Sequence, residues 1–378
     1  MATRAAPMKP DDFVTLHRIG EGAFSKVYLK RHVVDDKLYA VKVLKRLHES
    51  EDDEAQKRIL AATKREVRIL TMCQHPHIIQ FYATMQSDDE SQYVTEYCEG
   101  GDLSTLIRAK RTLPTPAVRY ITAQVASALH YLHAAEKRSF PLVAGAPLRK
   151  ATIIHRDVKP QNIVLTATRQ VKLIDFGSAS NPLEEIPADQ VMSFVGTVHY
   201  MAPEMLQNPD NTSPATDFWS LGCVVYEMLV GRRPFEGATY PLMNDICTKP
   251  VDIPAWVDPD GADLIRQLMA KEHTERLYGE KVLEHPFLKD TLSWSTQDMA
   301  RSWIRNAEWE SDGDVKKCRL CSKDFGLLRR RHHCRNCGRV FCHECSDKVS
   351  PIPDSTYRAA ERVCHDCYAN LVEASHAS

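Results

Sequence analysis

The sequence predicts an α+β chain in which a small β-rich segment precedes a larger helical one and a short metal-binding segment follows. Three observations support this prediction. Alternating apolar residues over 13–45 are typical of strands, helical spacing dominates much of 49–288, and eight of the 12 cysteines lie between Cys318 and Cys367. At roughly 100–200 residues per domain, a chain of 378 residues holds two or three domains.

Composition excludes several classes of protein. A hydrophobic fraction of 43% is that of a globular protein, and a net charge of −1 argues against a uniformly basic nucleic-acid coat. The first ten residues lack the apolar core of a secretory signal, and no run approaches the 18 apolar residues of a membrane span. Ala2 excludes N-myristoylation. We therefore expect an intracellular protein whose thiols stay reduced.

The elements can be assigned in order along the chain. Residues 13–45 read as short strands around a glycine-rich turn, and residues 49–73 as a helix with one apolar face. Helical spacing runs over 103–133, whereas Pro and Gly in 136–152 predict a loop. Residues 217–230 form a strongly apolar, buried helix, and the remainder to 288 is helical with Pro breaks. Residues 288–308 read as an ordered linker.

The cysteines after residue 317 form four pairs with two intervening residues each. These pairs are Cys318/Cys321, Cys334/Cys337, Cys342/Cys345 and Cys364/Cys367. Such spacing lets both thiolates of a pair reach one tetrahedral zinc ion, so four pairs predict two closed structural Zn²⁺ sites. A segment of this size buries little core, so the metals would hold it folded. The other four cysteines, Cys73, Cys98, Cys223 and Cys247, read as small buried hydrophobic residues.

Three further motifs lie in the first 290 residues. A glycine-rich block, Gly20 to Ser25, and a strand lysine, Lys42, are weak signals when taken singly. The block His155-Arg156-Asp157 with Asn162 is followed by Asp175-Phe176-Gly177 and then Ala202-Pro203-Glu204. This ordered set is the signature of protein kinases. Residues 13–287 therefore resemble the eukaryotic protein kinases, which implies a bilobal kinase fold with a small β-rich lobe and a large helical lobe.

The resemblance implies roles for individual residues. Lys42 would hold the ATP phosphates and pair with Glu66, Asp157 would accept the proton of the substrate hydroxyl, and Lys159 would stabilise the transferring phosphoryl group. Asn162 and Asp175 would hold Mg²⁺. The resemblance also implies a nucleotide pocket, formed by Ile19, Gly20, Glu21, Gly22, Ala23, Phe24, Ser25, Val27, Ala40, Lys42, Glu96, Cys98, Asn162 and Asp175. Asp217 would brace the catalytic loop, and Arg276 would pair with Glu204.

Finer features resemble the phosphoinositide-dependent protein kinases of the AGC group. Lys159 is similar to serine/threonine kinases, and 193–200 (SFVGTVHY) is similar to the activation segment of that family, with Ser193 as its phosphosite. Gln161, the insertion at 136–152 and the stretch 47–60 depart from the pattern, and the last puts the family's substrate-docking pocket in doubt. A catalytically dead scaffold is the alternative, but Lys42, Asp157 and Asp175 favour an active enzyme.

The cysteine-rich segment resembles the FYVE zinc fingers. Trp309-x-x-Asp312, the block RRHHCR from Arg330 to Arg335, and Arg362-Val363-Cys364 carry this resemblance. It implies crossed zinc pairing, with Cys318, Cys321, Cys342 and Cys345 on one ion and the other four on the second. It also implies binding of phosphatidylinositol 3-phosphate on endosomal membranes. The lipid-binding residues would be Asp312, Arg330, Arg331, His332, His333, Arg335 and Arg362.

Charge and hydrophobicity in this segment agree with a lipid reader. Between Lys316 and Arg339 there are nine Lys and Arg and one acid, Asp324. Phe325, Leu327 and Leu328 form an apolar tip expected to insert into the bilayer. Two readings stay open for single residues: the histidines as zinc ligands and Asp312 as a salt-bridge partner. A RING-like ligase module would mix His into its ligands, and nucleic-acid binding is not expected without interleaved aromatic residues.

We therefore expect an N-terminal extension (1–12), a kinase domain (13–287), a linker (288–308), a FYVE-type finger (309–371) and a tail (372–378). The cofactors would be ATP, Mg²⁺ and two Zn²⁺, and the partners would be protein substrates and membranes carrying phosphatidylinositol 3-phosphate. Such a protein would be cytoplasmic and peripheral on endosomal membranes. By analogy, its substrates would be activation segments of other AGC kinases.

Overall fold

A computed structural model gives the arrangement of most of the chain. It describes residues 8–21, 25–45, 54–86, 90–134, 139–140, 149–150, 152–180, 198–208, 211–294, 310, 312–313, 315–326, 329–352 and 360–376. The expected activation-segment site Ser193 lies outside these residues, as do Gly22, Ala23, Phe24, Leu327 and Leu328. Most of the expected linker and most of the 136–152 insertion also lie outside them.

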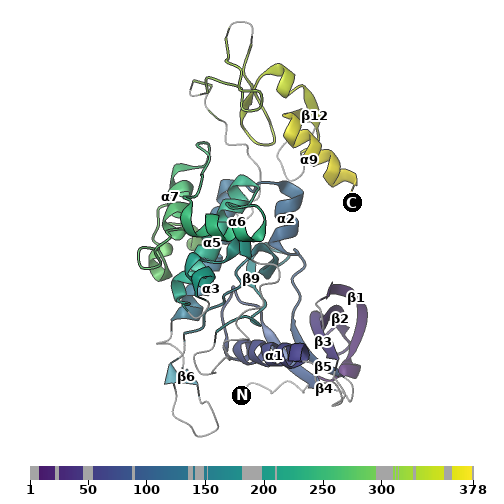
Figure 1. The fold of residues 1–378 in the computed structure, drawn as a ribbon. Coiled ribbons are helices and arrows are strands. Elements are labelled where there is room, and N and C mark those ends of the chain that lie inside the picture. The colour runs from purple at the N-terminus through teal and green to yellow at the C-terminus, as the bar shows by residue number, and fades with distance from the viewer. Residues whose placement is uncertain are drawn as a thin grey trace.

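The N-terminal lobe is a five-stranded antiparallel sheet with the strand order β1-β2-β3-β5-β4. Its strands are β1 (Phe13–Glu21), β2 (Ser25–His32), β3 (Leu38–Lys45), β4 (Phe81–Gln86) and β5 (Glu90–Glu96). The expected helix over 49–73 is α1 (Glu54–Met72), which lies beside the sheet in Figure 1. Val41 and Val94 are fully buried in the core of this sheet. The alternation over 13–45 was therefore a correct guide to strands.

The C-terminal lobe is helical. Its helices are α2 (Leu103–Lys110), α3 (Thr115–His133), α4 (Pro203–Gln207), α5 (Pro214–Val230), α6 (Thr239–Thr248) and α7 (Pro259–Leu268). The continuous helical spacing over 103–133 misses one break: Arg111 has a φ of 63°, and Pro114 precedes the first residue of α3. The apolar helix over 217–230 is α5, whose Trp219 and Tyr226 are fully buried. It ends at Gly231, whose φ of 82° suits a residue without a Cβ.

Short strands complete this lobe. The strands β8 (Ile163–Leu165) and β9 (Val171–Leu173) form a hairpin after the catalytic loop. Part of the segment expected as a loop over 136–152 pairs instead, because β6 (Ser139–Phe140) and β7 (Arg149–Lys150) form a two-stranded antiparallel ladder. Among the described helices of the whole chain, none has the length and apolarity needed to cross a bilayer.

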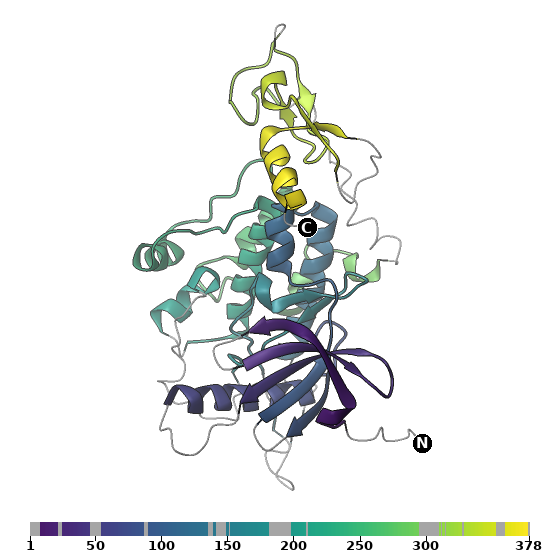
Figure 2. The ribbon, with the colours of Figure 1, turned by 90° about the vertical axis from the view of Figure 1, so that its right-hand side faces the viewer.

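The C-terminal module is small and has its own core, built around the cysteines and Phe341. Its elements are β10 (His332–His333), β11 (Val340–Phe341), β12 (Lys348–Ser350), β13 (Glu361–Val363) and α9 (His365–His376). The strands pair as two short antiparallel ladders, β10 with β11 and β12 with β13. In Figures 1 and 2 the module lies at the end of the helical lobe that carries α2, far from the β-sheet lobe.

Candidate functional site

Lys42 and Glu66 form an ion pair between the sheet and α1. Lys42 lies on β3, which is hydrogen-bonded on both sides, opposite Val27 of β2 and Tyr93 of β5. Its Nζ lies 2.8 Å from Oε2 of Glu66, whose side chain is nearly buried. Burial alone would lower the pKa of Lys42. The negative charges of Glu66 and Asp175 outweigh this effect, so the pKa is raised above its ordinary value. Lys42 therefore carries a fixed positive charge between the two lobes.

The catalytic loop gathers four polar side chains. Nζ of Lys159 lies 2.7 Å from Oδ2 of Asp157, and Nδ2 of Asn162 donates to the carbonyl and the carboxylate of Asp157, both at 2.8 Å. The fourth, Asp175, acts electrostatically on Lys42. The structure thus brings together the residues that the sequence predicted for base, phosphate and magnesium contacts. Carboxylate and amide oxygens such as those of Asp175 and Asn162 are suitable ligands for Mg²⁺.

Asp217, on α5, holds the backbone of this loop. It is fully buried and accepts hydrogen bonds from the backbone N–H of His155 and of Arg156, both at 2.8 Å. Its Oδ2 also lies 2.7 Å from Nε2 of His133, a partner that the sequence analysis did not identify. Burial alone would raise the pKa of Asp217. The hydrogen bonds and charges of its partners outweigh burial, so the pKa lies below its ordinary value. Arg156 has a φ of 62°, so the bonds secure a strained backbone.

Besides Asn162 and Asp175, the described residues expected in the nucleotide pocket come from β1, β2, β3, the end of β5 and the segment after it. Ile19 and Val27 lie on paired strands, and Ala40 lies opposite Thr95 of β5. The carboxylate of Glu96 is tied to Nζ of Lys172 at 2.7 Å and accepts from the N–H of Gln80 at 2.7 Å. Burial and the nearby Glu96 raise the pKa of the Cys98 thiol to about 12.

Two arginines lie where the activation segment begins. Arg65, next to Glu66 on α1, donates to the carbonyl of Gly177 at 3.0 Å, and Nε of Arg156 donates to the carbonyl of Ser178 at 2.6 Å. At the other end of that segment, Arg276 makes a buried bidentate pair with Glu204, at 2.7 and 2.9 Å. The expected Glu204–Arg276 contact is therefore present.

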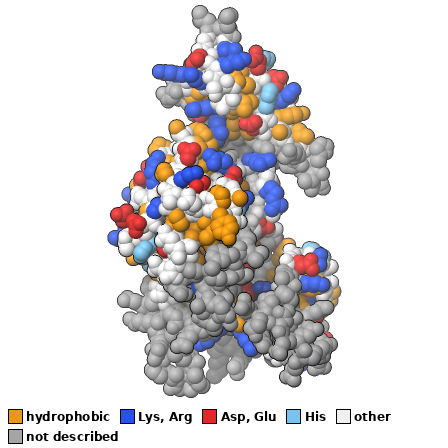
Figure 3. All heavy atoms as spheres, viewed as in Figure 1, with side chains coloured by type: hydrophobic (Ala, Val, Ile, Leu, Met, Phe, Trp, Pro, Cys, Tyr) orange, Lys and Arg blue, Asp and Glu red, His pale blue; other side chains and the backbone are white. Residues whose placement is uncertain are grey.

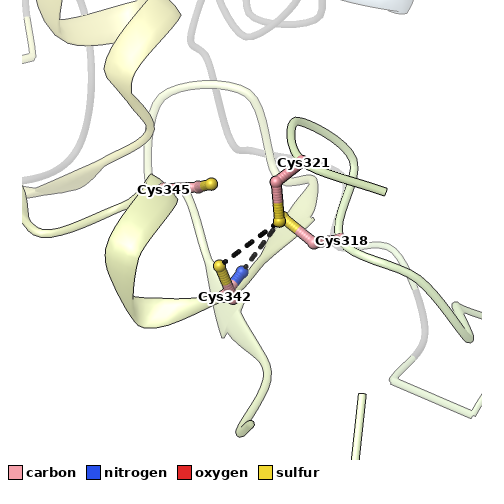
Figure 4. Close-up of side chains that lie close together, drawn as sticks. All are labelled: Cys318, Cys321, Cys342 and Cys345. Carbon is pink, nitrogen blue, oxygen red and sulfur yellow. Dashed lines mark hydrogen bonds between the residues drawn. The ribbon is translucent and has the colours of Figure 1, made fainter. Parts of the chain in front are cut away.

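The eight late cysteines form two groups of four thiols. The groups are Cys318, Cys321, Cys342 and Cys345, and Cys334, Cys337, Cys364 and Cys367, each with its sulfur atoms within 4.8 Å of one another. Figure 4 shows the first group converging on one point, with the N–H of Cys342 donating to Sγ of Cys318. These are the two crossed sets implied by the sequence. Four converging thiolates fit tetrahedral zinc, with no position left for catalysis.

The predicted lipid residues make contacts at several places in the module. The ring of His333 lies 3.8 Å from Asp312, and Nη1 of Arg362 donates to the carbonyl of Ser346 at 2.7 Å. Arg330 is exposed, while Arg335 lies 3.7 Å from Glu361. Figure 3 shows Lys and Arg side chains at several places on this module. Two acids, Asp312 and Glu361, therefore lie beside these residues, and the sequence analysis anticipated Asp312 alone.

Two predicted lipid-face residues contact each other. Nε of Arg331 donates to the carbonyl of Val315 at 3.0 Å, and its guanidinium lies 4.9 Å from the ring centre of Phe325. Phe325 is half-buried and packs against the cysteine-lined core of the module. Phe325 thus lies at the base of the expected apolar tip.

Sequence reasoning missed two residues that contact the predicted lipid residues, His343 and Glu310. The ring of His343 lies 5.7 Å from that of His332, and its Nδ1 is 3.3 Å from Nη1 of Arg362. The carboxylate of Glu310 pairs with Arg319 at 2.9–3.2 Å and accepts from the N–H of Val340 at 2.9 Å. The carbonyl of Glu310 lies 2.6 Å from Nε2 of His333. Glu310 fills an unspecified position of Trp309-x-x-Asp312 and His343 lies outside the quoted motifs, so no local signal marked either residue.

A β-sheet lobe and a helical lobe, with a lysine–glutamate pair and an aspartate-bearing loop between them, define a protein kinase; the two thiol groups define a zinc module. The chain belongs to the protein kinase family: residues 13–288 match the protein kinase domain. Residues 308–373 match the FYVE zinc finger.

Known relatives are serine/threonine kinases. The human 3-phosphoinositide-dependent protein kinase 1 is 30% identical over 377 residues, an alignment that covers 97% of this chain and 63% of that protein. The human putative 3-phosphoinositide-dependent protein kinase 2 is 30% identical over 76% of this chain and 68% of its own length. Mouse serine/threonine-protein kinase Sgk3 is 34% identical over 76% of this chain and 54% of its own length. The predicted kinase and finger families are confirmed.

Proposed function

We propose that this chain is an active serine/threonine protein kinase that a FYVE finger recruits to membranes carrying phosphatidylinositol 3-phosphate. The proposal of catalysis rests on two observations. Lys42 and Glu66 form an ion pair at 2.8 Å, and Asp157, Lys159 and Asn162 contact one another on one loop. A protein kinase that retains this pair and a metal-binding aspartate has the parts needed for phosphoryl transfer.

The reaction follows from these positions. The oxygen of a substrate Ser or Thr hydroxyl attacks the γ-phosphorus of ATP, the bond from that phosphorus to the ADP oxygen breaks, and the hydroxyl proton passes to Asp157. Lys159, 2.7 Å from Asp157, supplies positive charge beside the transferring group. Lys42 would hold the ATP phosphates, and Asn162 and Asp175 would hold Mg²⁺, which would neutralise phosphate charge.

Transfer of ³²P from ATP to a panel of Ser/Thr peptides tests this proposal. We expect Asp157→Asn to lower the rate by at least about 10²-fold, because it removes the proton acceptor. Asp263→Asn, which changes an exposed side chain of α7, is the matched control and should retain the wild-type rate. Equal ³²P incorporation with wild type and Asp157→Asn would refute catalysis by this site and favour the alternative, a catalytically dead scaffold.

The substrates we propose are activation segments of other AGC kinases, and Ser193 is proposed as a site of self-phosphorylation. The names and the extent of the matching relatives support the first point. The second is supported by Arg65 and Arg156, whose guanidinium groups lie where the segment begins. A phosphate adds about two negative charges that such arginines can bind. Mass spectrometry after incubation with ATP should find phosphate on Ser193, and Ser193→Ala should lower activity; unchanged activity would remove this role.

Membrane recruitment is supported by Arg330, which is exposed, and by His332, His333 and Arg362, which are half-exposed. Guanidinium and imidazole N–H groups suit the phosphates of an inositol headgroup. Sedimentation with vesicles of phosphatidylcholine, with and without phosphatidylinositol 3-phosphate, tests it. Arg330→Ala should lower binding, whereas Lys317→Ala, a cation 4.0 Å from Asp324, should not. Equal sedimentation with both vesicle types would refute lipid recognition.

A further inference from the structure

Arg339 of the finger lies against Trp256 of the kinase domain. The guanidinium carbon is 3.6 Å from the centre of the indole ring, the shortest cation–ring distance among the described residues. This is a stacking distance, and Trp is the most favourable aromatic partner for a cation. Trp256 itself packs against the main core of the helical lobe, so its ring is a fixed platform. Arg339 therefore does not join the lipid-binding face, although it lies within the basic segment.

A second contact joins the two domains elsewhere. Helix α9 of the finger contacts α2 of the helical lobe, and Figures 1 and 2 both place the two helices together. A single contact would let the finger rotate about it, whereas two contacts at different places define an orientation. The segment that carries Arg339 is also held inside the finger, because Glu310 bonds the backbone of both Gly338 and Val340. The side chain that meets Trp256 thus projects from a firm base.

Docking leaves the lipid-binding face accessible. In the whole chain Arg330 remains exposed, and His332, His333 and Arg362 remain half-exposed. The catalytic Asp157 and Lys159 also keep partial exposure. The contact therefore obstructs neither the lipid site nor the kinase site.

We infer that the finger docks on the helical lobe through Arg339–Trp256 and α9–α2, so that a membrane-bound finger holds the catalytic domain in one orientation toward the bilayer. This inference rests on the proposed lipid recruitment for its functional part. The docking itself does not depend on lipid. The partner of this surface is the kinase domain of the same chain.

The length of the linker makes such a contact effective. Fifteen residues separate Trp294 from Glu310. Even a random coil of that length would span only on the order of 20 Å, which corresponds to a millimolar effective concentration. Trp294 stacks on Tyr120 of α3 at 6.3 Å, so the near end of the linker is fixed to the helical lobe. Even a contact with a Kd of about 1 mM between separate pieces would then be populated roughly half the time.

Small-angle X-ray scattering of the full zinc-loaded chain tests the docking. Arg339→Ala and Trp256→Ala should each lower the docked-to-undocked ratio by roughly 2- to 30-fold, the range of a cation–π contact, and so raise the radius of gyration. Because they remove the same contact from opposite sides, the double variant should add little. Arg339→Lys should behave more like Ala than like Arg, since an ammonium cannot stack.

The controls are Lys317→Ala in the finger and Tyr240→Ala, whose side chain is 86% exposed on α6. Both should scatter as wild type. Additive effects of the two interface variants, or wild-type scattering from both, would overturn the docking. Bound zinc is measured for each variant, so that a folded finger is verified independently.

A second measurement tests the orienting role. On vesicles containing phosphatidylinositol 3-phosphate, Arg339→Ala should phosphorylate a vesicle-tethered peptide several-fold more slowly than wild type and a free peptide at the wild-type rate. Faster phosphorylation of the free peptide by this variant would mean that docking inhibits the kinase, which overturns the orienting role. If wild type fails to bind the vesicles, the lipid proposal is refuted, while the scattering result still decides the docking.

Discussion

Replacing Asp217 by Asn should destabilise the kinase domain and slow catalysis, although the two side chains have nearly the same shape. The carboxylate serves three donors: Oδ2 faces the N–H of His155 and Nε2 of His133, and Oδ1 faces the N–H of Arg156. An amide has one acceptor oxygen, and its NH₂ group must face one of these donors. The best orientation keeps the oxygen at the Oδ2 position and sacrifices the bond to Arg156.

The expected cost follows from that count. One hydrogen bond to a charged group contributes about 1.5–3 kcal/mol, and the N–H left facing another donor adds to the loss. We expect Asp217→Asn to lower the free energy of unfolding by about 2–3 kcal/mol, and Asp217→Ala, which removes all three bonds, by about 3–5 kcal/mol. Because the Arg156 backbone loses its restraint at a φ of 62°, Asp157 should be misplaced and kcat should fall.

Urea unfolding followed by circular dichroism measures the stability change. The control is Asp245→Asn, which removes an exposed ion pair with Lys249 and should cost less than about 0.5 kcal/mol. The pKa of Asp217 is lower in the folded than in the unfolded protein. Its contribution to folding stability is therefore complete above the unfolded pKa of about 3.9 and is lost as the pH falls through the folded pKa. The difference in free energy of unfolding between wild type and Asp217→Asn should therefore shrink below about pH 4. A difference from wild type no larger than that of Asp245→Asn would refute this reasoning.

Four other outcomes are expected. Glu66→Gln should lower kcat/KM for a peptide by about 10- to 100-fold, since Lys42 loses its charged partner and the phosphates are displaced; wild-type kinetics would contradict this. Zinc chelation should unfold the finger, seen as lost dispersion of its NMR signals, and leave the urea midpoint of the kinase domain in place. Glu310→Ala should weaken vesicle binding several-fold with two zinc ions still bound by metal analysis, because Val340 and Arg319 lose their carboxylate partner and the carbonyl that His333 contacts is then less firmly held. Cys98, with a pKa of about 12, should react with iodoacetamide roughly a thousandfold more slowly than an ordinary thiol, as measured by mass spectrometry.

The sequence could predict which residues of the expected kinase site lie close together because short motifs carry them. Asp157, Lys159 and Asn162 lie within six residues, so the loop that joins them leaves little freedom in their arrangement. Lys42 and Glu66 are 24 residues apart, but one is on a strand bonded from both sides and the other on the adjacent helix. The cysteine pairs likewise carry their geometry in their spacing.

Other features depended on contacts that no local pattern encodes. His133, which contacts Asp217, lies 84 residues before it on another helix. Glu310 contacts Arg319, which lies between the cysteines of the first pair. Both are polar residues of common types, whose sequence positions are equally compatible with solvent exposure. The break between α2 and α3 was missed because apolar spacing continues through it. The helix nevertheless ends at Arg111, whose φ is 63°.

The basic segment from Lys316 to Arg339 shows why composition alone overstates a binding surface. Its cations divide by partner: Arg319 pairs with Glu310, Arg331 bonds the carbonyl of Val315, and Arg339 stacks on Trp256. Each of these contacts shapes the finger or joins it to the kinase domain. Fewer cations are thus available for the proposed lipid contact than the nine that the sequence contains. Since each Lys or Arg near an anionic surface contributes about 1 kcal/mol, recruitment by this finger should be reversible and sensitive to salt.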